Sequence, residues 1–110
     1  SVAYQGEARG LGMDYVASCC SLATGGLEPD LTFYIDLDPK VGLLRTHRRR
    51  SHTKEEVDRL ENEALHFHQK VREGFLKLAK ANPQRILTLD GTLSPDVVFS
   101  KALAAIQQKL

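Results

Sequence analysis

The segment Leu31–Leu37, with the sequence LTFYIDL, most limits the folds open to this chain. It is rich in β-branched and aromatic residues and carries a single charge at Asp36, which is typical of a strand buried on both faces of a parallel sheet. Such a strand needs neighbours on both sides, yet the sequence offers one other strand, Arg85–Leu89 (RILTL). Two strands make a poor sheet by themselves. We therefore expect the chain to be the C-terminal part of a larger α/β domain.

Helical patterns surround the two predicted strands. Apolar residues at helical spacing predict a helix over 13–22, which Gly25 and Gly26 would end. Asp38 and Pro39 are typical of a helix start, here for a short helix that runs to Arg45 or His47. Residues 1–12 hold three glycines and no strong periodicity, so they are interpreted as a loop.

A long helix is predicted over 54–80, because Thr53 and Glu56 have the spacing of a capping box. An apolar stripe follows one face of this helix. It comprises Val57, Leu60, Ala64, Phe67, Val71, Phe75 and Leu78. A last helix over 94–109 would be capped by Ser94 and Pro95. The order of helix, strand, helix–loop–helix, strand and helix predicts an α/β fold with parallel crossovers.

Composition excludes several classes of protein. With 110 residues, 42% of them hydrophobic, the chain suits one compact domain with a modest core. Its net charge of +1 argues against a general polyanion binder. Neither an apolar run long enough for a membrane helix nor a secretory signal is present in these residues. Cys19 and Cys20 are adjacent and poorly placed to pair, so we expect a reduced, cytoplasmic protein in which both lie in the core.

The basic segment from Pro39 to Lys54 is the strongest chemical signal, with six Lys or Arg residues and no acid. Arginine side chains bind phosphate oxygens in bidentate fashion, and a mobile arginine loop can neutralise a phosphoryl group in transfer. A solvated basic surface loop is an equally good interpretation. Nucleic-acid binding is a weaker one, because no aromatic residues interleave with the arginines. The arginines concerned are Arg45, Arg48, Arg49 and Arg50.

Other chemistry-bearing patterns are weak. His66 and His68 are two apart on a helix and cannot both reach one metal ion. The glycines at 6, 10 and 12 lack the Lys-Ser/Thr of a phosphate-binding P-loop and follow no strand, so a turn is the better interpretation. No metal site and no nucleophile–base arrangement is predicted.

Several motifs together resemble bacterial thymidylate kinase. They are AYQG, PDLT, the helix DPKVGLLR, the helix DRLE and the segment RILTLDGTLSPDVV, and the resemblance covers essentially the whole chain. It implies a P-loop kinase fold with a parallel sheet, of which this chain holds the last two strands and their helices. The implied reaction transfers a phosphoryl group from ATP to dTMP with Mg²⁺. The family's P-loop and Asp-Arg-Tyr-like motif are absent from these 110 residues, so we expect the isolated chain to be inactive and Mg²⁺ to be held mainly elsewhere.

The resemblance also implies roles for individual residues. Residues 1–12 would form the dTMP-site loop, 45–58 the LID and 90–94 the adenine-side loop. Ser1 and Gln5 match positions that read the thymine base, Tyr4 matches a tyrosine beside the deoxyribose, and Arg9 lies near the same pocket. On the ATP side, Arg45 would stack on adenine, Arg48, Arg49 and Arg50 are catalytic candidates, and Asp90, Gly91 and Thr92 lie beside the adenine. Asp58, Arg59 and Glu61 match a signature that would position the LID.

Alternatives remain open at this point. The chain is compatible with another P-loop nucleotide or deoxynucleoside kinase, which only the AYQG segment disfavours. It is also compatible with a non-enzymatic module that binds phosphate or nucleic acid through its arginine loop. For the complete enzyme the resemblance implies a homodimer, with no membrane and no nucleic-acid partner.

Overall fold

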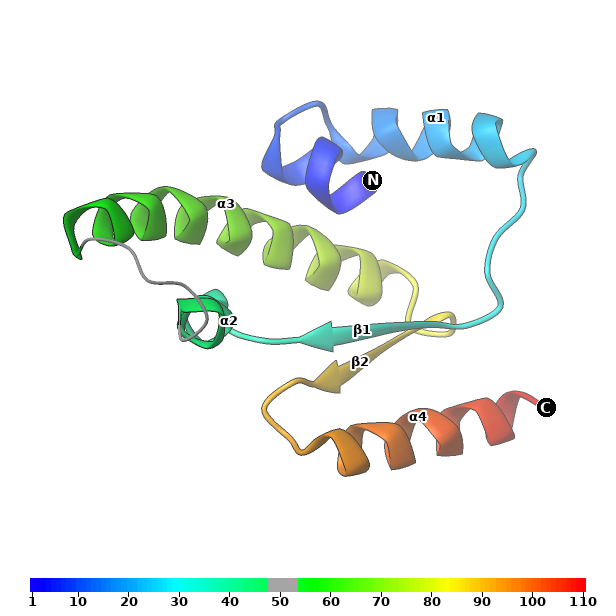
Figure 1. Cartoon of the computed structure of the whole chain (residues 1–110). Coiled ribbons are helices and arrows are strands. Elements are labelled where there is room, and N and C mark those ends of the chain that lie inside the picture. Colours follow the sequence, from blue (N-terminus) through cyan, green and yellow to red (C-terminus); the bar gives the residue numbers. More distant parts are fainter. Residues whose placement is uncertain (48–53) are drawn as a thin grey trace.

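The computed structural model describes residues 1–47 and 54–110, and the side chains of 1–45 and 62–110. The capping box predicted at Thr53 and Glu56 and the arginines at 48–50 lie outside these ranges. Seven elements follow one another along the chain (Figure 1). They are η1 (Val2–Ala8), α1 (Met13–Thr24), β1 (Thr32–Asp36), α2 (Pro39–His47), α3 (Lys54–Ala81), β2 (Ile86–Asp90) and α4 (Pro95–Lys109).

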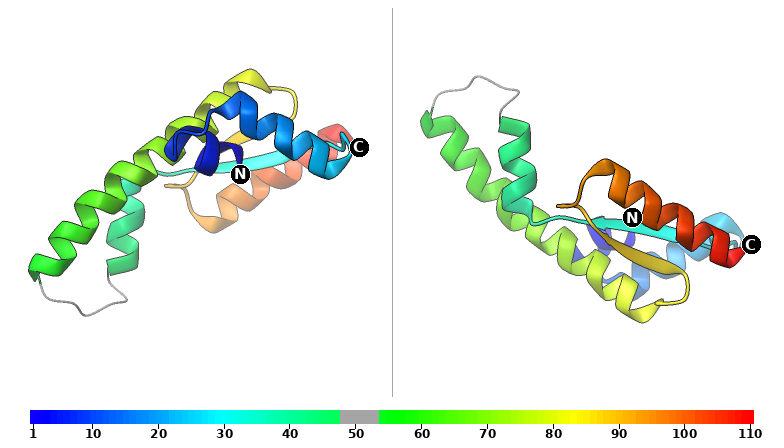
Figure 2. Two further views of the ribbon diagram at one scale, coloured as in Figure 1. Left: turned by 90° about the horizontal axis from the view of Figure 1, so that it is seen from above. Right: turned by 90° about the horizontal axis from the view of Figure 1, so that it is seen from below.

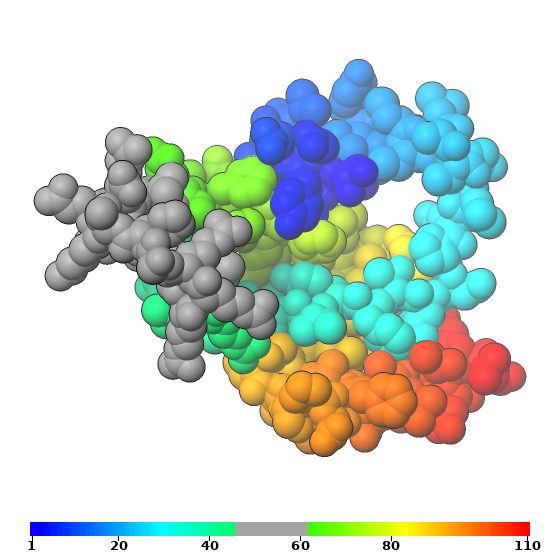
Figure 3. Space-filling model, viewed as in Figure 1, coloured from blue at the N-terminus to red at the C-terminus, as the bar shows by residue number. Residues whose placement is uncertain are grey.

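The two strands form a parallel pair between layers of helices. Thr32 pairs with Ile86 and Asp36 with Asp90, so both strands end at the same edge of the sheet. Helix α3 packs on one face and α4 on the other, while η1 and α1 lie beyond α3 (Figures 1 and 2). In the space-filling view η1 and α1 are on one side of the molecule and α4 is on the opposite side (Figure 3). The predicted α/β class with parallel crossovers is therefore confirmed.

The prediction that β1 is buried on both faces is wrong for these residues. Side chains alternate along a strand, so Tyr34 and Asp36 face α3 while Ile35 points to the other face. The side chain of Ile35 is 56% exposed, and Leu87 of β2 is also exposed. The reason is that β2 is the one strand paired with β1 within the described part of the chain. The buried apolar side chains there are few and mostly small: Ala3, Val16, Val71, Ala79 and Leu89.

Residues 1–12 are helical in part and not the predicted loop. Val2–Ala8 form a π-helix, in which the backbone N–H of Arg9 donates to the carbonyl of Tyr4 at 3.0 Å. The chain then turns tightly into α1, and a Cβ on Gly6 would lie 2.8 Å from the Cα of Met13. Glycine is needed there because two backbone segments touch, so the residue that suggested a loop instead permits close packing.

The predicted helix ends are confirmed by their caps. Gly25 ends α1 in the left-handed conformation, with φ of +66°. Asp38 Oδ1 accepts a hydrogen bond from the backbone N–H of Lys40 at 2.9 Å where α2 begins, and Ser94 caps α4 by accepting from Val97 at 3.3 Å. Among the described residues, no helix combines the length and apolar character that a membrane span requires.

The cysteines do not lie in the core as expected. Cys19 is exposed and Cys20 half-buried, and both are free thiols. Helix α1 packs mainly against η1, and Val16 is its one buried side chain, so a single narrow face is covered. Cys20 lies one helical turn after Val16 and is half-buried at the edge of that face, whereas Cys19 falls outside it.

The contact between η1 and α3 depends on a glycine. Gly74 of α3 is buried, and a Cβ there would lie 3.1 Å from both the Cα and the Cβ of Ala3 and 3.0 Å from the Cβ of Glu7. The two helices therefore meet backbone to backbone at this point. Lys77 donates to Glu7 Oε1 at 2.6 Å one turn further along α3.

Replacing Gly74 with valine should destabilise the protein by about 1–3 kcal/mol, because the added carbons force η1 away from α3. Valine has a better helix propensity than glycine, so propensity alone predicts the opposite sign. The measurement is urea denaturation, with Glu73→Val at the exposed neighbouring position as control. Equal or greater stability of Gly74→Val would show that the close approach does not matter.

Candidate functional site

A cavity of about 340 Å³ lies where β1 ends. Four elements supply its walls: η1 contributes Tyr4, β1 contributes Tyr34, α2 contributes Pro39 and Leu43, and α3 contributes His68, Arg72 and Phe75. Ligands of open α/β sheets bind at the carboxyl ends of the strands. The cavity has that position, and its aromatic walls suit a ligand with a planar ring.

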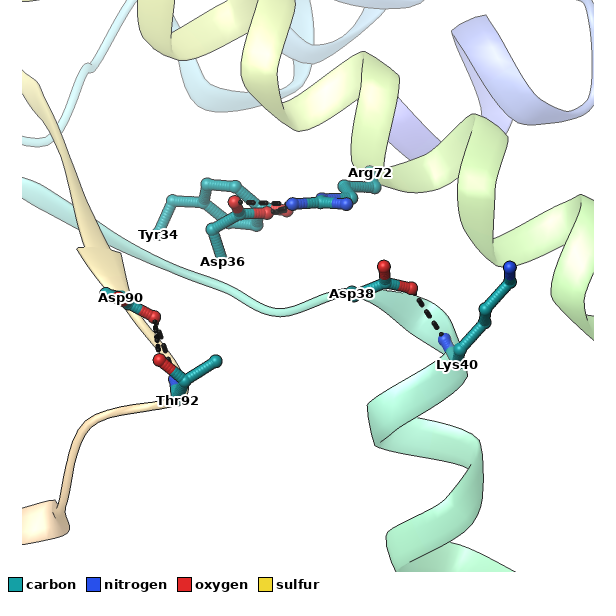
Figure 4. Close-up of polar contacts among 7 residues, drawn as sticks. All are labelled: Tyr34, Asp36, Asp38, Lys40, Arg72, Asp90 and Thr92. Carbon is teal, nitrogen blue, oxygen red and sulfur yellow. Dashed lines mark hydrogen bonds and ion pairs between the residues drawn. The ribbon is translucent and has the colours of Figure 1, made fainter.

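An ion pair lies beside this cavity and involves Arg72, one of its lining residues. The guanidinium of Arg72 donates two hydrogen bonds to the carboxylate of Asp36, from Nε to Oδ1 at 2.8 Å and from Nη2 to Oδ2 at 3.0 Å. The hydroxyl of Tyr34 donates to Oδ1 of the same carboxylate at 2.9 Å. Figure 4 shows the three side chains side by side, with Asp38 and Lys40 at the start of α2 nearby. A two-pronged arginine–carboxylate contact fixes direction as well as distance.

The cluster also shifts the ionisation of its members. Hydrogen bonds from Arg72 hold the pKa of Asp36 below its usual value, because they favour the charged carboxylate. Burial, and after it the hydrogen bond to Asp36, raises the pKa of Tyr34 to about 12. At neutral pH Tyr34 is therefore a protonated donor, and Asp36 a charged acceptor.

An aromatic cluster extends from this ion pair to the N-terminal segment. The ring of Tyr34 stacks on Phe75, with centroids 5.0 Å apart and planes at 15°. Phe75 meets Tyr4 edge-on at 6.2 Å, and Tyr4 also contacts Phe67 at 5.9 Å. The guanidinium of Arg9 lies 5.4 Å from the centroid of Phe67. Tyr4 thus lies between two rings of α3, and Arg9 covers one of them.

The structure brings together only some of the predicted substrate residues. Tyr4 lines the cavity, and Arg9 contacts the same aromatic cluster. Ser1 and Gln5 have exposed side chains, and the described contacts link them through the backbone N–H of Gln5, which donates to the Ser1 carbonyl at 2.8 Å. Arg45 is exposed near the end of α2.

The predicted adenine-side residues form a well-ordered turn after β2. Asp90 Oδ1 accepts from both the backbone N–H and the hydroxyl of Thr92, at 2.9 and 2.7 Å. These hydrogen bonds lower the pKa of Asp90. Gly91 donates to the Asp36 carbonyl at 2.7 Å, and a Cβ there would lie 2.8 Å from that oxygen. The turn is therefore joined directly to the end of β1.

Sequence reasoning missed Tyr34, Asp36 and Arg72 as members of the site. One signal was available, because Asp36 is the only charge in an otherwise apolar strand and lies at its carboxyl end. Arg72 and Phe75 are three residues apart and share a helix face, but nothing in the sequence shows what that face meets. The described residues contain no group of three or more metal-ligating side chains.

Comparison with known proteins places this sequence in a family. The chain matches the family model for thymidylate kinase over residues 1–102. The chain belongs to the thymidylate kinase family. Curated relatives named thymidylate kinase include one from Latilactobacillus sakei subsp. sakei, 46% identical over 98% of this chain and 49% of its own length. Another from a Geobacillus species is 43% identical over 100% of this chain and 51% of its own length.

The chain spans about half the length of the curated relatives it matches. A relative from Chlorobaculum parvum gives the same proportion, with 42% identity over 97% of this chain and 51% of its own length. The resemblance inferred from the sequence motifs is thus confirmed. Two parallel strands with helices on both faces agree with the α/β architecture that membership of the thymidylate kinase family implies.

Asp36 makes stability depend on pH in acid. Its folded pKa is depressed, so its ionised form stabilises the fold above about pH 4, the unfolded value, and that contribution is lost as the pH falls through the folded pKa. Asp36→Asn should therefore show a smaller loss of unfolding free energy between about pH 5 and 2 than the parent protein. The measurement is urea denaturation across this range.

The matched control for this pH experiment is Asp30→Asn, because Asp30 is exposed in the connection between α1 and β1. That variant should keep the parent's dependence on acid. Identical acid curves for Asp36→Asn and the parent would show that the ion pair with Arg72 does not couple folding to protonation.

Proposed function

We propose that this chain forms the C-terminal, nucleotide-binding half of an enzyme that transfers a phosphoryl group from ATP to dTMP, giving dTDP. The match to the thymidylate kinase family carries the proposal, because it covers residues 1–102 and includes Tyr4 at the cavity. The cavity supports it, since its aromatic walls lie at the carboxyl end of β1, the edge at which open α/β sheets bind ligands.

The dTMP side of the proposed site is the segment 1–12. Tyr4 would lie beside the deoxyribose and leave too little room for a 2′-hydroxyl. Its ring is held between Phe67 and Phe75, which supports a steric role because a fixed ring cannot turn away. Ser1 and Gln5 would read the thymine base with their exposed side chains, and Arg9 would lie near the same pocket.

The ATP side would be formed by two loops. In the turn 90–94, hydrogen bonds within the loop fix the backbone of Asp90, Gly91 and Thr92, which supports recognition of adenine by backbone groups. In the LID, residues 45–58, Arg45 would stack on adenine. Arg48, Arg49 and Arg50 would neutralise charge on the transferring phosphoryl group.

The described residues do not fit a Mg²⁺ site. The carboxylates at the strand ends are already engaged, Asp36 by Arg72 and Asp90 by Thr92. No step of the proposed mechanism is therefore assigned to a metal held by this chain. The homodimer and the cytoplasmic setting stay predictions.

The first test joins this chain to the portion of the Latilactobacillus sakei enzyme outside the match. We expect the chimera to form dTDP from dTMP and ATP and to prefer dTMP to UMP. The 110-residue chain alone should form none, because positioning supplies most of the catalysis in phosphoryl transfer and these residues span about half the length of the relatives. The assay is coupled ADP release, with circular dichroism to establish that both proteins are folded. A folded chimera that releases no ADP in the presence of dTMP and ATP would refute the proposal.

A second test addresses base reading. Gln5→Ala in the chimera should weaken dTMP binding by about 1–2 kcal/mol, the effect of one lost hydrogen bond in a buried complex. Gln69→Ala is the matched control, because Gln69 is an exposed glutamine on α3. Titration calorimetry measures both affinities. Equal affinities in the two variants would remove Gln5 from the site.

A further inference from the structure

We propose that Arg72 is a positioning residue for substrate discrimination: through Asp36 and Tyr34 it holds the aromatic cluster that fixes Tyr4, and so it sets how strongly a ribose 2′-hydroxyl is excluded. This inference rests on the proposed function, in which Tyr4 lies beside the sugar. It assigns a role to three residues that the sequence motifs leave without one.

The first step is the geometry at Asp36. Its carboxylate accepts three hydrogen bonds, two from the Arg72 fork and one from the Tyr34 hydroxyl. The side chain of Asp36 is 20% exposed and that of Arg72 is 35% exposed, so the pair is partly shielded from water. Shielded, two-pronged contacts of this kind are stronger and more directional than exposed ion pairs. Asp36 therefore fixes the Tyr34 hydroxyl and the Arg72 side chain relative to each other.

The second step is the stacking of Tyr34 on Phe75. Tyr34 and Asp36 are two apart on β1 and share the face that α3 covers. Phe75 is three residues after Arg72 and shares its face of α3. The Asp36–Arg72 ion pair and the stacked rings of Tyr34 and Phe75, whose centroids are 5.0 Å apart, thus both join β1 to α3. A change at Arg72 should shift α3 relative to β1 at Phe75.

The third step leads from Phe75 to Tyr4. Phe75 and Phe67 contact Tyr4 from two directions, at 6.2 and 5.9 Å, and Tyr4 is 40% exposed towards the cavity. The remaining freedom of its ring is therefore set by α3. A small movement of Phe75 would therefore move the ring of Tyr4. Such a movement matters because a displacement of about 1 Å in a positioned group can change a rate by up to about a hundredfold.

The test compares dUMP with UMP in the chimera, because these substrates differ only at the 2′ position. Arg72→Gln should lower the ratio of their kcat/KM values by about fivefold or more, with the KM for ATP changed by less than about twofold. Arg72→Lys keeps the charge but loses the fork, so it should restore part of the ratio. Tyr34→Leu removes the stacked ring and should lower the ratio like Arg72→Gln.

Lys80→Gln is the matched control. It replaces an exposed lysine of the same helix, about two helical turns beyond Arg72, and leaves the ion pair between Lys77 and Glu7 of η1 in place. Its dUMP to UMP ratio should equal the parent's. Because a ratio measured on one preparation does not depend on the fraction of folded enzyme, a merely structural role of Arg72 would lower activity and leave the ratio unchanged.

The outcomes separate this inference from the proposed function. An unchanged ratio in Arg72→Gln or in Tyr34→Leu overturns the inference, as does an equal drop in Lys80→Gln. A parent chimera that phosphorylates dTMP but accepts UMP as well as dUMP also overturns it, together with the sugar role of Tyr4. A folded parent chimera without activity on dTMP refutes the proposed function itself, and the inference with it.

Discussion

The two-pronged ion pair between Arg72 and Asp36 is the contact on which the arrangement of this molecule depends. It ties the longest helix to the end of β1, within two residues of the cap that starts α2 and beside the backbone hydrogen bond from Gly91. Two segments besides β1 therefore bind Asp36, the middle of α3 at its carboxylate and the turn after β2 at its backbone carbonyl, and α2 begins just after it. Because the core of small side chains supplies limited burial, directional polar contacts carry an unusual share of the geometry here.

The regular elements could be predicted from the sequence because each has a local signal. The apolar run at Leu31–Leu37 and the caps at Asp38 and Ser94 each involve only a few consecutive residues. They can therefore be recognised without knowing how the rest of the chain packs. The parallel pairing also followed, because a helical segment of that length separates the strands. The predictions that Ile35 and Cys19 are buried were wrong. Burial depends on which other elements pack against a strand or helix, and no local pattern in the sequence shows this.

The residues of the candidate site also differ in how far the sequence predicts them. Tyr4 and Arg9 were predicted as site residues from the family resemblance, and the structure brings both to one aromatic cluster. The partners of that cluster were not found, since Tyr34, Asp36 and Arg72 meet only after a strand and a helix 36 residues apart are packed together. Phe67 and Phe75 were predicted as members of an apolar stripe, and their contact with Tyr4 shows that part of this stripe packs against η1.

The π-helix of Val2–Ala8 has a consequence for the evolution of this segment. Its wide turn joins residues five apart, and it is this spacing that lets Tyr4 and Arg9 both reach Phe67. Loss of one residue would restore the tighter α-helical turn and rotate one of the two side chains away. Natural variation should therefore tolerate exchanges of side chains here far better than changes of length, and insertions or deletions should be rare between Ser1 and Gly12.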